Sequence, residues 1–163
     1  TDNVYNNRNS GQFLHKLGHD LDTTFYATVI GSGTQSPDIR PTAFLVNECE
    51  NVFISGWGGV LNAFPYIGGS TNNLPITSNA HQSTTDGTDF YLMVLLKDAK
   101  RLLYATYFGG SEALIHVDGG TSRFDRKGRV YQSVCAGCGG NSDWIDHSEF
   151  ALISAFQQYT KQC

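Results

Sequence analysis

The sequence contains an internal repeat with a fixed register, and this feature constrains the fold more than any other. Residues 14–31 align with residues 92–109 at an offset of 78, without a gap. The same offset carries residues 52–59 onto 130–137. Because two separate segments match at one offset, chance is a poor explanation. A duplicated unit of this size is typical of repeat arrays and propellers.

Each repeat unit is expected to form four short strands. Runs of aromatic and β-branched residues that end at Gly, Asp, Asn or Pro are typical of strands. The expected strands are 13–17, 24–30, 42–46 and 52–55 in the first unit, and 90–96, 102–108, 120–124 and 130–134 in the second. Four antiparallel strands per repeat are the organisation of a propeller blade. Two blades cannot close a ring of about four to eight. Since the chain opens within a repeat, we expect a longer protein to supply further blades.

The tail of the chain departs from this pattern. Leu152, Phe156 and Tyr159 fall at helical spacing. Asp146 stands three residues before Glu149, as in a capping box at a helix start. The sequence therefore predicts one short helix after the β-repeats.

The predicted fold class is all-β, with two four-stranded antiparallel propeller-type blades and a short C-terminal helix. The expected divisions are a first blade with a long connecting loop over 1–87, a second blade over 88–143 and the helical tail over 144–163. Long loops often carry binding function. The polar loop 57–87 is therefore the favoured contact surface.

Composition and charge exclude several classes of partner. The net charge is −4 and no basic run occurs, which argues against a nucleic-acid partner. No stretch approaches the roughly 20 apolar residues of a membrane-spanning helix. Hydrophobic residues make up 40% of the chain, enough for a packed core.

Two of the four cysteines form the motif Cys135-Ala136-Gly137-Cys138. The favoured interpretation is a structural thiol pair or disulfide in an oxidising compartment. A zinc half-site would need two further ligands. A redox motif would need a strand that leads into a helix, whereas glycines surround this motif.

Acidic and histidine residues cluster in two places, neither of which satisfies a metal motif. The group Asp143, Asp146, His147 and Glu149 is interpreted as a loop followed by a helix cap. The segment 86–89 is similar to part of a calcium loop but lacks the remaining ligands. We therefore expect no metal site.

No motif predicts catalysis or a cofactor. The Gly-x-Ser-x-Gly motif of hydrolases is absent. His116 and Asp118 could be combined with a serine into a triad, but any chain of this size allows such a choice without geometry to support it. We expect no catalytic residues and no cofactor.

Aromatic side chains near the long loop are the candidates for ligand binding. Trp57, Phe64 and Tyr66 could stack on a sugar or a peptide, since aromatic faces suit such contacts. For Trp57, packing between adjacent blades is the favoured interpretation, and ligand contact is the alternative.

The repeated motif resembles a known family. Residues 102–110 read Leu-Leu-Tyr-Ala-Thr-Tyr-Phe-Gly-Gly and are followed by Arg129-Val130-Tyr131. This pattern is similar to the seven-bladed β-propeller-type repeat of large bacterial surface proteins. Segments 85–95, 116–125 and 135–143 suggest a closer likeness to propeller regions of very large secreted proteins of gliding bacteria.

The resemblance implies a non-enzymatic module that is exported by the type IX route and displayed at the cell surface or outside the cell. It implies roles in adhesion, surface binding or gliding motility. The implied partners are other blades of the parent chain and a surface glycan or protein. Two alternatives stay open: an extracellular enzyme that acts on polysaccharide, and a structural spacer in a giant adhesin.

Overall fold

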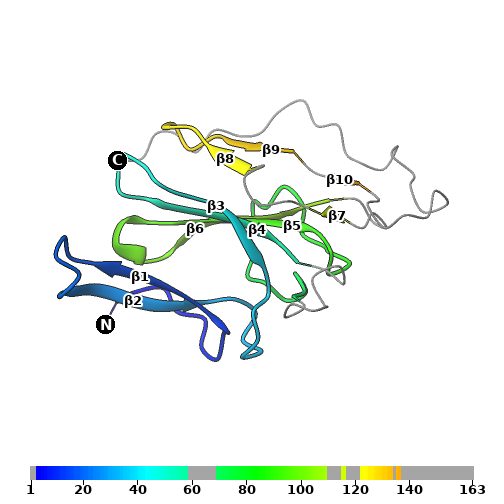
Figure 1. Cartoon of the computed structure of the whole chain (residues 1–163). Helices are drawn as coiled ribbons and strands as arrows, with labels where there is room; N and C mark the ends of the chain where they lie inside the picture. Colours follow the sequence, from blue (N-terminus) through cyan, green and yellow to red (C-terminus); the bar gives the residue numbers. More distant parts are fainter. Residues whose placement is uncertain (1–2, 59–68, 110–114, 117–121, 134, 137–163) are drawn as a thin grey trace.

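The computed structural model shows a chain built mostly of antiparallel β-strands (Figure 1). It describes residues 3–58, 69–109, 115–116, 122–133 and 135–136. The strands are β1 (Gln12–Leu17), β2 (Thr24–Ile30), β3 (Arg40–Val46), β4 (Val52–Trp57), β5 (Phe90–Leu95), β6 (Leu102–Phe108), β7 (Ile115–His116), β8 (Ser122–Phe124), β9 (Val130–Gln132) and β10 (Cys135–Ala136). A short 3-10 helix, η2 (Lys97–Ala99), lies between β5 and β6.

Each of the eight expected strands overlaps an observed strand, so the predicted all-β class is confirmed. The short strands β7 and β10, which pair with each other, were not expected. Within the described residues no sheet closes on itself, and no ring of blades is present. The predicted helix in 144–163 lies outside the described residues, and the structure gives it no support.

The strands group differently from the expected blades. The one four-stranded sheet among the described residues has the order β3-β4-β5-β6, while β1-β2 and β8-β9 form separate two-stranded sheets. The central sheet therefore spans the expected blade boundary between residues 87 and 88. The physical reason is that the offset of 78 relates equivalent residues but does not define the residue at which a repeat unit begins or ends. The repeat in the sequence carries no information on which strands share a sheet.

The two central strands are buried on both faces. Every residue of β4 and β5 is buried. Such strands are recognised by continuous apolar runs rather than by alternation, as in Phe90-Tyr91-Leu92-Met93-Val94-Leu95 of β5. In contrast, β1 has Leu14 as its one buried residue, and only one of its faces is covered.

The chain is arranged in three layers. The β1-β2 hairpin lies on one side of the central sheet and the β8-β9 hairpin on the other (Figure 1). By the offset of 78, β1-β2 corresponds to β5-β6, and β8-β9 corresponds to β3-β4. Each outer hairpin is thus the equivalent of one half of the central sheet.

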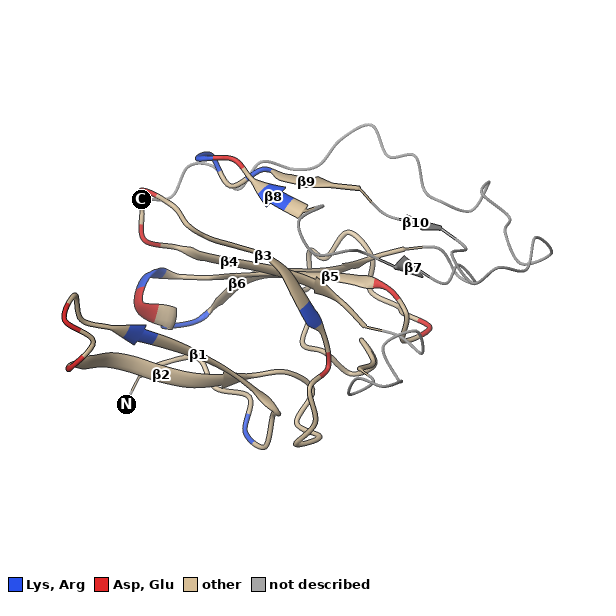
Figure 2. Cartoon of the chain, in the orientation of Figure 1, with Lys and Arg blue, Asp and Glu red and all other residues tan. Residues whose placement is uncertain are grey.

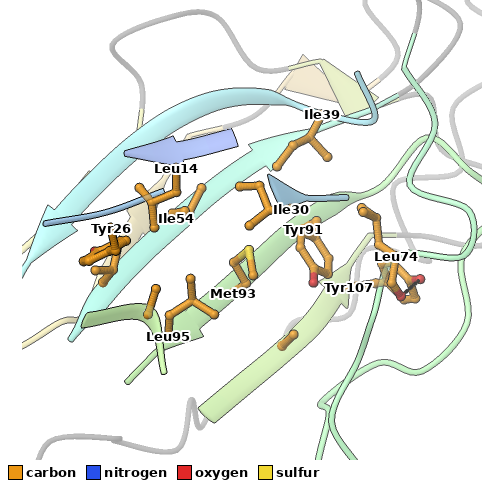
Figure 3. Close-up of a cluster of buried hydrophobic side chains, with 13 residues drawn as sticks. Leu14, Tyr26, Ile30, Ile39, Ile54, Leu74, Tyr91, Met93, Leu95 and Tyr107 are labelled. Atoms are coloured by element: carbon orange, nitrogen blue, oxygen red, sulfur yellow. Dashed lines mark hydrogen bonds between the residues drawn. The ribbon is translucent and has the colours of Figure 1, made fainter. Parts of the chain in front are cut away.

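A separate hydrophobic cluster fills each space between layers. The first cluster, between the β1-β2 hairpin and the sheet, contains Leu14 and Tyr26 (Figure 3). The second, on the opposite face of the sheet, contains their equivalents Leu92 and Tyr104. Equivalent side chains therefore point in the same direction along the stack of layers. The repeat in the sequence thus corresponds to a repeat in the packing between layers as well as in the strands.

Acidic and basic residues gather in the turns at one end of the strands (Figure 2). Lys16 of β1 lies 3.0 Å from the Asp98 carboxylate and 3.3 Å from Glu50, and Lys97 also binds Glu50. The hydrogen bond from Lys16 lowers the pKa of Asp98, and Lys97 followed by Lys16 lowers the pKa of Glu50. Because these groups are partly exposed, each pair contributes little stability. Their effect is to orient the hairpin on the sheet.

The fold predicts a strong contrast between two Leu→Ala substitutions. Leu95 in β5 is 0% exposed, whereas Leu21 in the β1-β2 turn is 73% exposed. Leu95→Ala should reduce the free energy of unfolding by about 2–5 kcal/mol, because it leaves a cavity in a packed core. The matched control Leu21→Ala should stay within about 0.5 kcal/mol of the wild type. Urea denaturation measures both, and equal effects would contradict the layered core.

Candidate interaction surface

Trp57 lies in the core rather than on a surface. Its side chain is 2% exposed and belongs to the second hydrophobic cluster, together with Phe53 and Phe90. A ring in this position offers no face to a sugar, so its burial favours the packing interpretation. The other two aromatic candidates, Phe64 and Tyr66, lie outside the described residues.

The described part of the long loop runs along the outer edge of β6. The Tyr107 hydroxyl donates to the Leu74 carbonyl at 2.8 Å, and the Tyr91 hydroxyl donates to the Pro75 carbonyl at 2.6 Å. The backbone N–H of Thr77 donates to the Ala105 carbonyl at 3.2 Å. Residues 69–85, which we call the edge segment, therefore cover a strand edge that would otherwise expose unpaired backbone groups.

A segment also contacts the edge strand of the first repeat. The Tyr107 N–H donates to the Gln82 carbonyl, and in the first repeat the Asn7 N–H donates to the carbonyl of Val29, the equivalent of Tyr107. Thr28 also donates to the Tyr5 carbonyl. Residues 5–7 thus lie along the edge of β2 as the edge segment lies along β6, but at positions that the offset of 78 does not relate.

Sequence reasoning missed the aromatic rings that the structure does expose. Phe13 of β1 is 74% exposed, on the face of the hairpin that points away from the sheet. Phe25 of β2 is also exposed and lies at an irregularity of the β1–β2 pairing, with Lys16 Nζ 5.6 Å from its ring centroid. The equivalent of Phe13 is Tyr91, which the neighbouring layer buries. Large exposed apolar patches on a protein mark contact sites. Alternation along β1 and β2 would have identified this face, but only with knowledge of which face is covered.

A second exposed apolar set lies on different strands. Phe44 and Val46 of β3 are exposed, and so is Tyr131 of β9. Phe44 and Val46 alternate along β3, so they share one face of that strand.

The cysteines support an oxidising environment only in part. Cys49, in the β3–β4 turn, is disulfide-bonded. The turn is shaped by Asn47, whose side-chain oxygen accepts from the N–H groups of Cys49 and Asn51. The backbone of Cys135 pairs with that of His116, while Cys138 lies outside the described residues. The expected pairing of Cys135 with Cys138 therefore stays a prediction.

The described residues contain no group of three or more His, Cys, Asp or Glu side chains that could hold a metal ion. Asp86 accepts from the Thr88 N–H at 2.7 Å, which agrees with its interpretation as a turn that enters β5. The acidic group 143–149 and Asp118 lie outside the described residues. No helix in the described part of the chain is long and apolar enough to cross a membrane.

One buried carboxyl group has an unusual titration. Asp89 is 0% exposed, with Oδ2 accepting from Gln82 at 3.1 Å and Oδ1 without a hydrogen-bond partner. Burial raises its pKa to about 6, because removal from water disfavours the charged form. The nearby charge of Asp86 also raises this pKa, and hydrogen bonding from Thr85 and Gln82 opposes both effects. The Asp89 carboxyl is therefore enclosed by the fold.

Comparisons with known proteins leave the family unassigned. No family model matches the chain, and no curated protein or solved structure is significantly similar to it. The resemblance to the bacterial propeller-type repeat stays a prediction.

The raised pKa of Asp89 predicts that the free energy of unfolding depends on pH. Since its pKa is about 6 in the folded chain, against 3.8 for an ordinary aspartate in water, the folded state binds more protons between these values. Its contribution to stability therefore falls as pH rises through this window and levels off above pH 6. Asp89→Asn should gain stability relative to the wild type over the same window, by up to about 3 kcal/mol. Urea denaturation across the pH range measures this difference.

The matched control is Asp20→Asn, because Asp20 is exposed in the β1–β2 turn. Its stability should follow the wild-type pH profile. Parallel profiles for Asp89→Asn and the wild type would show that the Asp89 carboxyl titrates normally.

Proposed function

We propose that the chain is a non-enzymatic interaction or adhesion module, displayed at the cell surface or outside the cell and built from β-propeller-type repeats. The observation that carries the proposal is the β1-β2 hairpin, on which Phe13, Leu17 and Phe25 are all exposed. Aromatic rings of this kind supply rigid contact area to proteins and glycans. The rest of the hairpin serves as the scaffold that holds them.

Three further features support this proposal. The disulfide at Cys49 fits an oxidising compartment outside the cytosol. The net charge of −4 disfavours a nucleic-acid partner. The resemblance of residues 102–110 to repeats of large bacterial surface proteins extends the proposal to export by the type IX route and to adhesion or gliding motility.

The buried sheet is a scaffold in this proposal. Trp57 and the edge segment hold the central sheet together, and the hairpin face supplies the contact. This division follows from burial: Trp57 is packed in the second cluster, and Leu74 of the edge segment is packed in the first. Phe13 lies on the opposite side of its hairpin from either cluster.

The proposal predicts that the purified chain is retained on an array of defined polysaccharides and does not cleave them. Phe13→Ser and Phe25→Ser should each weaken retention by about tenfold, the effect of losing one aromatic contact of roughly 1.5 kcal/mol. Leu21→Ser is the matched control, since it removes an exposed apolar residue from the turn rather than from the strands. Array binding and an assay for released reducing ends provide the two measurements.

Two results would overturn the proposal. Release of reducing ends would identify an enzyme that acts on polysaccharide. Failure to bind any polysaccharide or cell-surface protein would leave the role of a structural spacer.

A further inference from the structure

Gln82 joins the edge segment to the end of β6. Its backbone carbonyl accepts from the Tyr107 N–H at 3.2 Å, and its side-chain Oε1 accepts from the Gly109 N–H at 2.9 Å. Its own N–H donates to the Thr106 hydroxyl at 3.0 Å. Its side-chain Nε2 donates to the Asp89 carboxyl at 3.1 Å. One residue therefore links the edge of β6 to a buried carboxyl group.

The edge segment itself encloses this carboxyl group. Asp89 is 0% exposed, and its Oδ1 atom has no hydrogen-bond partner. A carboxylate in such a place loses its hydration, whereas a neutral carboxyl group loses far less. Hydrogen bonds from Thr85, Gln82 and the Asp86 N–H favour the charged form, but burial outweighs them and raises the pKa of Asp89 to about 6.

The charged and titratable groups near Asp89 do not offset its burial. Asp86 carries a charge of the same sign and adds to the effect of burial on the pKa of Asp89. On β6, burial and the Asp89 charge both raise the pKa of Tyr107. On β5, burial and the charges of nearby groups, including Asp38 of the β2–β3 loop, raise the pKa of Tyr91. Each charged group named here is acidic, so none of them stabilises an ionised Asp89.

We infer that Asp89 is a pH-dependent latch for residues 77–85 of the edge segment. While its carboxyl group is protonated, these residues stay closed on the edge of β6. Once the carboxyl group is ionised, they open locally far more often, because opening lets water reach the charge. The inference goes beyond the proposed function and does not depend on it, since none of these residues lies on the β1-β2 hairpin.

Residues 77–85 can open while the sheet stays folded. Thr77 and Gln82 supply the backbone hydrogen bonds to β6, and residues 78, 79, 81, 83 and 84 are exposed. In contrast, every residue of β4 and β5 is buried, and Leu74 fixes the start of the edge segment in the first cluster. Segments with few buried apolar contacts open at a lower free energy than the core does.

The direction and size of the pH effect follow from the two protonation states. In the open segment the pKa of Asp89 returns toward 3.8, against about 6 in the closed segment. Below pH 3.8 the carboxyl group is protonated in both forms, so opening is rarest there. Between the two values the open form loses its proton first, and the equilibrium constant for opening rises about tenfold per pH unit. It levels off above pH 6, about a hundredfold higher than in acid.

Native-state amide hydrogen exchange, followed by NMR from about pH 4 to about pH 7 in low concentrations of urea, tests the latch. The Tyr107 and Gly109 amides report on opening, because both donate to Gln82. Their protection factors should fall by about a hundredfold over this range. Urea should change them little, since a local opening exposes little surface. The amides of the β4–β5 ladder should be better protected and depend strongly on urea.

Two variants assign the effect to one side chain. Asp89→Asn keeps an oxygen that accepts from Gln82 but cannot ionise, so Tyr107 and Gly109 should keep their low-pH protection throughout. His81→Gln is the matched control, since His81 lies in the same segment and histidine side chains in general titrate near neutral pH. This variant should keep the wild-type dependence on pH.

Three results would overturn the inference. The first is protection of the Tyr107 and Gly109 amides that does not change with pH. The second is equal protection and equal urea dependence for these amides and the β4–β5 ladder, because the segment would then open only when the whole sheet unfolds. The third is a pH dependence that persists in Asp89→Asn, and its loss in His81→Gln would identify the histidine as the titrating group. Retention on polysaccharide is measured separately, so none of these results decides the proposed function.

Discussion

The pairing of β4 with β5 is the interaction on which the rest of the structure depends. It joins strands separated by residues 58–89, and every residue of both strands is buried. Closing a loop of that length has an entropic cost that grows only slowly with loop length, and burial of both strand faces offsets it. This pairing creates a sheet with two apolar faces. Each face then requires a covering layer, which the β1-β2 and β8-β9 hairpins provide.

Stacking by a repeated unit has a consequence at the outer layers. Leu14 and Leu92 are equivalent, and each points into the cluster that follows its own layer. Within the described part of the chain, each outer hairpin has one face that lies outside the two clusters. On the β1-β2 hairpin that face carries Phe13, and on the β8-β9 hairpin it carries Tyr131. The exposed aromatic residues are therefore a result of the repeat itself, and they are the part of the molecule that is free to contact a partner.

The sequence predicted the strands well, but it did not establish whether Trp57 is buried. Strand positions depend on local patterns of apolar and turn residues, so all eight expected segments appear in the structure. Whether Trp57 is exposed depends on the layer above it, which no local pattern reveals. The edge segment was expected to be part of a long connecting loop that serves as the contact surface, and backbone hydrogen bonds such as that between Thr77 and Ala105 attach it to β6. The raised pKa of Asp89 likewise follows from burial that only the folded chain produces.

The sequence by itself determined the antiparallel strand segments, the turns between them and the register of the repeat. Local periodicity and turn chemistry encode these features. The tertiary structure alone decided that β3 to β6 share a sheet and which strand faces are covered. The offset of 78 aligns equivalent residues, but it does not define the residue at which a repeat unit begins. Strands pair as they do because the pairing buries apolar side chains that are far apart in the sequence. Those side chains become buried only when the layers have assembled.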